Sequence, residues 1–328
     1  MAVLGIFIFV CMAGWFLHRY FRTSRPHRFP REGYVGAAAL LISEVLLFAE
    51  VEPVATYFTP IAWTAYIFWA DAAVFSIRGK SLWQTYRSEF VCLALCSIPL
   101  WLVFEAFNLR LANWVYVGLP ENWLARQFGY AWSFATIWPG IFETATLLRA
   151  LRVIQPSLPK ESLCNRAAYS RKPARLLDRT KTLTLLSGII LLTVPVLVPQ
   201  RIGAYLFGAV WLGFILLLEP INFHWGRQSL WRDWKQGDTS RLKALLAAGL
   251  ICGLLWEFWN YWAQARWVYT VPILPEWKIF AMPLLGYLGF PPFAVECFVM
   301  FAFVAPFLDK VLRKAGCKEH NWGEALQL

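Results

Sequence analysis

Two carboxylates in this sequence stand in apolar surroundings, each with an asparagine three residues later. Glu257 and Asn260 lie in the tryptophan-rich run LLWEFWNYWAQARWVY, and Glu105 and Asn108 lie in EAFNLRLANWVYVGLPENW. A spacing of three places both side chains of each pair on one face of a helix. Because burying a carboxylate costs free energy unless a partner compensates, each pair predicts a hydrogen-bonding or functional role.

The two stretches repeat the same residues in the same order. Each contains Glu-x-x-Asn, then Trp-Val-Tyr, then Pro-Glu ahead of a tryptophan. Upstream, DAAVFSIRGKSLW matches EPINFHWGRQSLW and aligns Asp71 with Glu219. Downstream, PGIFE matches PFAVE and aligns Glu143 with Glu296. Three matches in the same register predict an internal duplication.

Composition predicts the surroundings of these acids. Hydrophobic residues make up 59% of the chain and charged residues 16%, and the mean hydropathy is +0.48. Repeated apolar runs near twenty residues long are typical of an integral membrane protein. We expect an all-α bundle with about nine spans: 2–17, 34–51, 60–77, 90–108, 130–150, 183–199, 204–222, 244–263 and 281–308.

The distribution of basic residues predicts the topology. Lys and Arg concentrate in alternate loops, which the positive-inside rule assigns to the cytoplasm together with the C-terminus, leaving the N-terminus outside. The net charge of +11 is then mainly a topology signal, with the headgroups of anionic membrane lipids as partners. A nucleic-acid partner is not expected, and the oligomeric state stays open.

The repeats and spans divide the chain into five parts. Residues 1–33 form an N-terminal anchor span and a basic cytoplasmic loop, 34–150 and 183–308 form two four-span repeats, 151–182 form a basic cytoplasmic linker, and 309–328 form a cytoplasmic tail. An even number of spans gives both repeats the same orientation. Parallel repeats are related by an axis along the membrane normal and share a cavity between them.

The repeated acids within spans are the candidate catalytic groups. An acid at the centre of a span costs about 2.5–3.5 kcal/mol on the insertion scale, so these side chains should not face lipid. Glu143 and Glu296 lie deepest, each four residues after a proline, Pro139 or Pro292. We expect these prolines to bend their spans and the acids to line the cavity.

Structural roles are the alternative for the other acids. Glu105 and Glu257 stand near the outer ends of their spans, where water or free backbone groups can satisfy a carboxylate. Asp71 and Glu219, a secondary acidic pair near the cytoplasmic ends, have arginines in the short loops that follow as possible partners.

Aromatic residues surround the repeated acids. The chain has 19 tryptophans, and such rings stack on flat apolar ligands or stabilise positive charge, although many collect at membrane interfaces or simply pack helices together. The expected ligand-contacting residues are Asn108, Asn260, Trp114, Trp267, Tyr116, Tyr269, Trp256 and Trp259.

Cofactor motifs are not found in the sequence. It has four histidines and seven cysteines, with no CxxC pair and neither a GxGxxG nor a P-loop pattern. These observations predict no zinc, haem or di-iron site and no nucleotide or flavin held by those motifs.

The second repeat resembles the membrane lycopene cyclase domain of bacterial heterodimeric and archaeal or fungal carotenoid cyclases. The resemblance rests on an acid at the end of one span, an outer loop with Trp-x-aromatic, and GYLGFPPFAVECFVMF with proline and acid in the next span. It covers about the last three spans of each half. The matching positions are Glu257, Trp267, Pro292 and Glu296 in one copy and Glu105, Trp114, Pro139 and Glu143 in the other. The family pattern has two adjacent acids after the proline, whereas this sequence has one.

The resemblance implies a cyclase or isomerase of isoprenoid or carotenoid lipids, and the expected location of the chain is a bacterial cytoplasmic membrane. An acid buried among aromatic groups remains protonated more readily and can protonate an alkene, while tryptophan faces stabilise the cation and a second carboxylate removes a proton. A proton-coupled transporter or a lipid-binding membrane protein would use the same symmetric acidic cavity.

Overall fold

The computed structural model describes residues 2–155, 179–274, 276–314 and 322–326. Helices make up 75% of the structure. Within the described residues, seven helices are long and apolar enough to cross a membrane. The expectation of a helical, multi-pass membrane protein is therefore confirmed. Most of the predicted basic linker, 151–182, and part of the tail, 309–328, lie outside the described residues.

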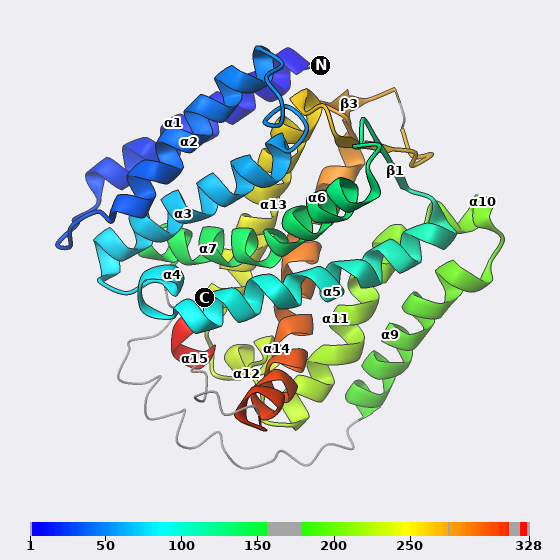
Figure 1. Cartoon of the computed structure of the whole chain (residues 1–328). Coiled ribbons are helices and arrows are strands. Elements are labelled where there is room, and N and C mark those ends of the chain that lie inside the picture. Colours follow the sequence, from blue (N-terminus) through cyan, green and yellow to red (C-terminus); the bar gives the residue numbers. More distant parts are fainter. Residues whose placement is uncertain (1, 156–178, 275, 315–321, 327–328) are drawn as a thin grey trace.

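The chain runs through two successions of elements (Figure 1). The first succession is α1 (Ala2–Arg22), α2 (Arg31–Phe48), α3 (Phe58–Arg78), α4 (Leu82–Thr85), α5 (Arg87–Leu111), β1 (Trp114–Val117), α6 (Trp123–Ala135) and α7 (Ile137–Ala150). The second is α9 (Arg179–Leu197), α10 (Gln200–Gly203), α11 (Phe207–His224), α12 (Leu230–Lys235), α13 (Ser240–Trp262), β2 (Arg266–Tyr269), β3 (Lys278–Ile279), β4 (Met282–Pro283), the 3-10 helix η1 (Leu284–Gly289), α14 (Phe290–Lys314) and α15 (Trp322–Ala325).

The predicted span 130–150 differs from the observed structure. It is divided between α6 and α7, which have 13 and 14 residues. At 1.5 Å per residue each helix is about 20 Å long, shorter than the roughly 30 Å hydrocarbon core. The two helices meet at Thr136, whose hydroxyl donates to the Ser133 carbonyl over 2.7 Å.

The two prolines expected to bend spans instead lie in the first turns of helices. Pro139 is the third residue of α7, and Pro292 is the third residue of α14. The first backbone N–H groups of a helix have no partner within that helix, so a proline in this turn sacrifices no internal hydrogen bond. These prolines mark where each helix begins.

The connections gather at two ends of the bundle. At one end, β1 pairs antiparallel with β2, with Val115 opposite Val268, and α10 and the start of α1 lie at the same end (Figure 1). At the other end lie α4, α12 and α15 (Figure 1). There α15 folds back onto the bundle, because Tyr86 donates to Glu324 over 2.9 Å and Trp322 packs edge-on against Phe301.

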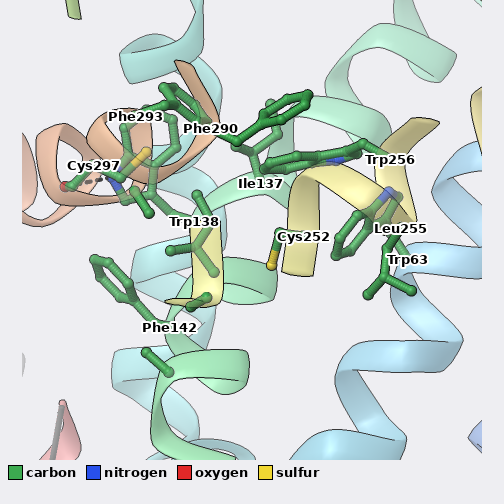
Figure 2. Packing of buried hydrophobic residues seen from close by; sticks show 14 of the residues in the cluster. Trp63, Ile137, Trp138, Phe142, Cys252, Leu255, Trp256, Phe290, Phe293 and Cys297 are labelled. Atoms are coloured by element: carbon green, nitrogen blue, oxygen red, sulfur yellow. Dashed lines mark hydrogen bonds between the residues drawn. The ribbon is translucent and has the colours of Figure 1, made fainter. Parts of the chain in front are cut away.

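The buried core lies around α7 and α14. Helix α7 packs against α3, α5 and α13, and α14 packs against α11 and α13. Figure 2 shows Trp138 of α7 between these helices, with its indole N–H donating to the Cys297 carbonyl over 2.8 Å. In contrast, the outlying helices α1, α2 and α9 expose Val3, Val35 and Leu183. Such apolar outer faces suit contact with lipid tails.

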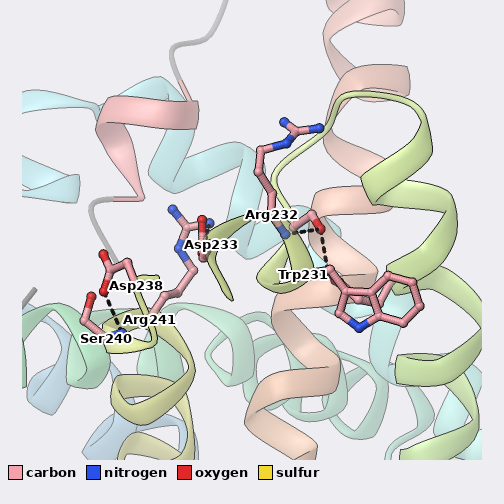
Figure 3. A network of polar contacts seen from close by, with 8 residues as sticks. Trp231, Arg232, Asp233, Asp238, Ser240 and Arg241 are labelled. Carbon is pink, nitrogen blue, oxygen red and sulfur yellow. Dashed lines mark hydrogen bonds and ion pairs between the residues drawn. The ribbon is translucent and has the colours of Figure 1, made fainter. Parts of the chain in front are cut away.

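A polar network fixes α12 at the end of α13 (Figure 3). Arg241 of α13 forms an ion pair of 3.2 Å with Asp233 of α12. Between them, Asp238 accepts a hydrogen bond of 2.9 Å from the Ser240 backbone N–H, closing the turn into α13.

Candidate functional site

A cavity of about 330 Å³ opens among the helices at the end of the bundle where β1 pairs with β2. This volume falls at the lower end of the range for small-molecule pockets, about 300–1,000 Å³. Side chains from α3, α5, α6, α7, α11, α13 and α14 line it together with the two paired strands. Elements from both halves of the chain therefore build one site.

Aromatic side chains form a large part of its wall, and several come from matching positions of the two halves. The matched lining pairs are Trp63 with Trp211, Phe104 with Trp256, Trp114 with Trp267, and Tyr116 with Tyr269. Ring centroids lie 5.0 Å apart between Trp63 and Trp256 and 5.9 Å apart between Trp101 and Phe293. These ring contacts join residues of the two halves, so the two sets of aromatic side chains pack together in one wall.

Glu105 lies one side chain behind this wall. Its Oε1 atom accepts hydrogen bonds from the Tyr116 hydroxyl at 2.6 Å, from the Trp101 indole at 2.8 Å and from the Trp114 indole at 3.2 Å. All three donors line the cavity. The carboxylate is only partly buried and is well satisfied, so its structural role in holding the aromatic wall is evident.

Glu257 occupies the corresponding place in the second half with fewer donors. Its Oε1 accepts from the Tyr269 hydroxyl at 2.6 Å, and the Trp267 indole donates to that hydroxyl at 2.7 Å. The side chain is fully buried, and within the described residues its Oε2 has no hydrogen-bond partner. Burial, reinforced by neighbouring Glu257, raises the pKa of Tyr269 well above its ordinary value, so this phenol stays neutral.

The repeated asparagines hold backbone turns. The amide of Asn108 donates to the Trp114 carbonyl over 2.9 Å and accepts from the Trp114 N–H over 3.2 Å. Asn260 makes the same two bonds with Trp267, at 2.9 and 3.0 Å. Neither asparagine lines the cavity in the described structure. Their spacing three residues after each acid positions the following strand and thereby its tryptophan and tyrosine.

Asp71 and Glu219 are also held by local hydrogen bonds, with partners other than the expected arginines. Asp71 accepts from the Ser81 hydroxyl at 2.9 Å and from the Trp83 backbone N–H at 2.7 Å. Glu219 accepts from the corresponding Ser229 hydroxyl at 2.5 Å and from the Trp231 backbone N–H at 2.8 Å. Each acid thus ties a spanning helix to the short helix after it, α4 or α12.

Glu143 and Glu296 lie away from the large cavity. Glu143 is 1% exposed and lines a second, much smaller cavity of about 10 Å³ that also includes Tyr86 and Glu324. Glu296 is 0% exposed, and neither of its carboxyl oxygens has a hydrogen-bond partner among the described residues. The structure therefore brings Glu105 and Glu257 close to the aromatic wall and leaves the other two acids outside its lining.

The remaining expected ligand contacts divide between cavity and core. Trp256 lines the cavity. Trp259 is 1% exposed and packs edge-on against Trp63, with ring centroids 5.1 Å apart, so it supports the wall from behind.

Several lining residues were not anticipated from the sequence. Trp63 and Trp211 each stand eight residues before a matched acid, Asp71 or Glu219. Extending the internal alignment upstream would have found them. Arg126 and Arg266 also line the cavity, but they occupy unmatched positions, so repetition gives no signal for them.

No group of three or more His, Cys, Asp or Glu side chains suited to a metal ion occurs in the described part of the chain. Comparison of the chain with protein-family models, curated proteins and solved structures finds no match. The residues and geometry of the site are therefore the basis for its function.

Proposed function

We propose that the protein is a membrane-embedded cyclase or isomerase of an isoprenoid-type lipid, similar in chemistry to the membrane lycopene cyclases. The observation that carries the proposal is the aromatic cavity, in whose wall two phenols, Tyr116 and Tyr269, are each hydrogen-bonded at 2.6 Å to a carboxyl group. An apolar polyene fits an aromatic wall, and a carbocation formed from it is stabilised by the ring faces.

Glu257 is the proposed source of the proton, acting through Tyr269. The 2.6 Å contact joins two oxygen atoms, so a neutral Glu257 can donate to the phenol oxygen while the phenol hydrogen points into the cavity. The phenol proton then moves to an alkene carbon as the Glu257 proton moves to the phenol oxygen. A C–H bond forms from the alkene electron pair and leaves a carbocation, which a second alkene of the same molecule attacks.

Glu105 is the proposed acceptor that completes the reaction through Tyr116. Loss of a proton from carbon to the Tyr116 oxygen, with transfer of the phenol proton to ionised Glu105, restores an alkene. The product has the same atoms as the substrate, so no oxidant or reductant is required. Glu105 is partly exposed, and proton exchange with water resets both acids.

The proposed architecture is a pair of parallel four-span repeats after an N-terminal anchor, with nine spans counted as membrane-embedded. In the pairing of β1 with β2, Val115 lies opposite Val268, and the tryptophan of each Trp-Val-Tyr lies opposite the tyrosine of the other copy. A twofold axis through the valine pair produces this register. The matching hydrogen bonds of both asparagines and both capping acids also support duplication.

The proposed location is a bacterial cytoplasmic membrane, with the N-terminus outside and the C-terminus inside. The cavity then opens toward the outer side, since β1 and β2 lie at the end opposite α4 and α12 (Figure 1). Reporter proteins fused after Gln155 and after Thr270 should lie on opposite sides. Finding both reporters on one side would exclude the topology and the parallel repeats.

A proton-coupled transporter is the second candidate, favoured by the buried carboxyl group of Glu296, whose oxygens have no hydrogen-bond partner in the described part of the chain. In that case Glu143 and Glu296 would carry the coupled proton. Glu143→Gln and Glu296→Gln then abolish function, whereas the cyclase proposal predicts that both variants retain turnover because neither acid lines the cavity.

Lipid bound to the purified full-length protein provides the direct test. We expect mass spectrometry of the extract to show an isoprenoid or polyene. Gly208 lines the cavity, and a Cβ atom added there would meet no atom within 4 Å, so Gly208→Phe should displace this lipid. Gly14 of α1 has equal space away from the cavity, which makes Gly14→Phe the matched control. An extract containing only ordinary phospholipid, unchanged by Gly208→Phe, would contradict the proposal.

A further inference from the structure

Two arginines are the charged side chains among the described residues that line the cavity. Arg126 belongs to α6 and Arg266 to β2, and both line the cavity with the tryptophans and tyrosines described above. Arg266 is exposed and Arg126 is partly exposed, so both are accessible to a ligand entering from solvent or headgroups. A purely hydrocarbon ligand has no use for two guanidinium groups at this position.

The backbone holds both arginines at the same rim. Val117 of β1 pairs with Arg266 of β2, and the chain continues from Val117 to Pro120. Arg126 then donates from Nε to the Pro120 carbonyl over 3.1 Å and from Nη2 to the Glu121 carbonyl over 3.3 Å. The turn after β1 therefore holds Arg126, and the strand pairing holds Arg266 beside the end of β1.

Neither guanidinium is saturated by these contacts. Arg266 donates from Nη1 to the Ala263 carbonyl over 3.2 Å, and Arg126 makes the two bonds just described. Among the described residues, neither arginine has a carboxylate within ion-pair distance. Each guanidinium carries five N–H donors, so both retain donors for an anion.

From this rim we propose that the ligand is an amphiphile with an isoprenoid tail in the aromatic cavity and a phosphate-type anionic head bound by Arg126 and Arg266. The inference rests on the proposed function and specifies its substrate class. A guanidinium is planar and matches two oxygens of a phosphate group at once, which suits it to this head better than a lysine would be. The tail then reaches the phenols of Tyr116 and Tyr269 from a fixed end, which would place one alkene next to the proton donor.

The test compares farnesyl phosphate with farnesol, which has the same tail without the anion. Radiolabelled ligands are bound to the full-length protein in phosphatidylcholine nanodiscs. We expect farnesyl phosphate to bind about tenfold or more tightly than farnesol. The double variant Arg126→Gln with Arg266→Gln should lose about that factor for farnesyl phosphate and keep the farnesol affinity, which also shows that the cavity remains folded.

Arg201 supplies a matched control, because it lies on α10 at the same end of the bundle and does not line the cavity. Arg201→Gln should bind both ligands as the parent does. Equal affinity of the parent for both ligands, or an equal loss in Arg201→Gln, would overturn the head-group assignment.

Two further outcomes of the binding experiment distinguish a failure of this inference from a failure of the proposed function on which it rests. If farnesol binds and Gly208→Phe removes it while the arginine variants change nothing, the cavity proposal stands and the anionic head is wrong. If neither ligand binds the parent protein, the isoprenoid function itself fails. Phosphatidylglycerol added to the nanodiscs should not displace farnesyl phosphate. Displacement at equal concentration would show that the rim takes an ordinary phospholipid, which overturns the isoprenoid assignment.

Discussion

Glu105 and Glu257 occupy matching positions, yet their surroundings differ. Both accept a 2.6 Å hydrogen bond from the tyrosine of the following strand. Glu105 is partly exposed and also accepts from two indoles. Glu257 is fully buried, and its second oxygen has no partner in the described structure. One acid is thus satisfied as part of the wall, whereas the other retains an unused oxygen.

The residue four positions before each glutamate differs between the two halves, and this explains much of the difference in hydrogen bonding. Trp101 precedes Glu105 and supplies an indole donor, whereas Gly253 precedes Glu257 and lets α14 approach closely. A Cβ atom at position 253 would overlap the Phe290 ring. The glycine therefore supplies no indole donor at this position and lets the apolar Phe290 ring pack against α13. Repeated residues can in this way diverge in chemistry while keeping their shared framework.

The largest expected effect of this difference is on turnover. Under the proposed mechanism, Glu257→Gln removes the transferable proton and should slow the reaction by about 100-fold or more, the usual contribution of a general acid. The same change in Glu105 should cost less, because a proton on carbon next to a cation is acidic enough for water to remove. Steady-state rates on the lipid identified from the extract measure both. An equal loss of turnover rate in the two variants would contradict the proposal that Glu257 is the proton donor and Glu105 the proton acceptor.

Closer packing around Glu257 predicts sensitivity to a single methyl group. Gly253→Ala should lower the free energy of unfolding by about 1–3 kcal/mol, the usual cost of overpacking, because Phe290 must shift. Gly14→Ala is the control, since its added methyl group meets no atom within 4 Å. It should be neutral or stabilising by up to about 1 kcal/mol through helix propensity. Thermal unfolding in detergent compares them, and equal midpoints would contradict the packing explanation.

The hydroxyl groups of the two tyrosines should differ in their contribution to stability. Tyr269→Phe leaves Glu257 without its described side-chain donor and should cost about 1–3 kcal/mol, the penalty for an unsatisfied buried polar group. Tyr116→Phe leaves Glu105 with two indole donors and should cost less than about 1 kcal/mol. Chemical unfolding of both variants measures the difference. A larger cost at Tyr116 would reverse the assignment of the well-satisfied acid.

The smallest contrast concerns the acids that cap the short helices. Asp71 uses one oxygen for the Ser81 hydroxyl and the other for the Trp83 N–H, so Asp71→Asn loses an acceptor and should cost about 1–2 kcal/mol. Glu219 accepts both of its bonds at Oε1. Glu219→Gln can keep both and should change the unfolding free energy by less than about 0.5 kcal/mol. An equal loss of unfolding free energy in Asp71→Asn and Glu219→Gln would show that the number of carboxyl oxygens used as acceptors does not determine the effect.

The long helices and the repeated acid and asparagine segments could be predicted from the sequence, because both depend on residues close together along the chain. Apolar runs near twenty residues admit few structures other than a membrane helix. The Glu-x-x-Asn and Trp-Val-Tyr segments recur together because the asparagine amide holds the strand whose tyrosine bonds the acid. Because these residues bond to one another within one short segment, they recur together in both copies of the sequence.

The depth of each acid and the rim of the cavity could not be predicted in the same way. The sequence predicted that Pro139 bends a continuous span. In the structure the span is interrupted at Thr136, and Pro139 lies in the first turn of the new helix α7. In the described structure, Glu143 and Glu296 lie outside the lining of the large cavity. Arg126 and Arg266 line the same cavity, and Arg266 is brought there by the pairing of β2 with β1, a contact between distant segments that spacing along one repeat does not reveal.

Proton transfer from the protein to carbon is the central claim, and turnover in deuterated water tests it most directly. Under the proposed mechanism, exchange loads the Glu257 and Tyr269 pair with deuterium, so the isoprenoid product should carry a new carbon–deuterium bond in the parent protein and in Glu105→Gln. Product formed in the same water by Glu257→Gln should appear only slowly. Product that forms at the normal rate without any carbon-bound deuterium would contradict acid catalysis at this site.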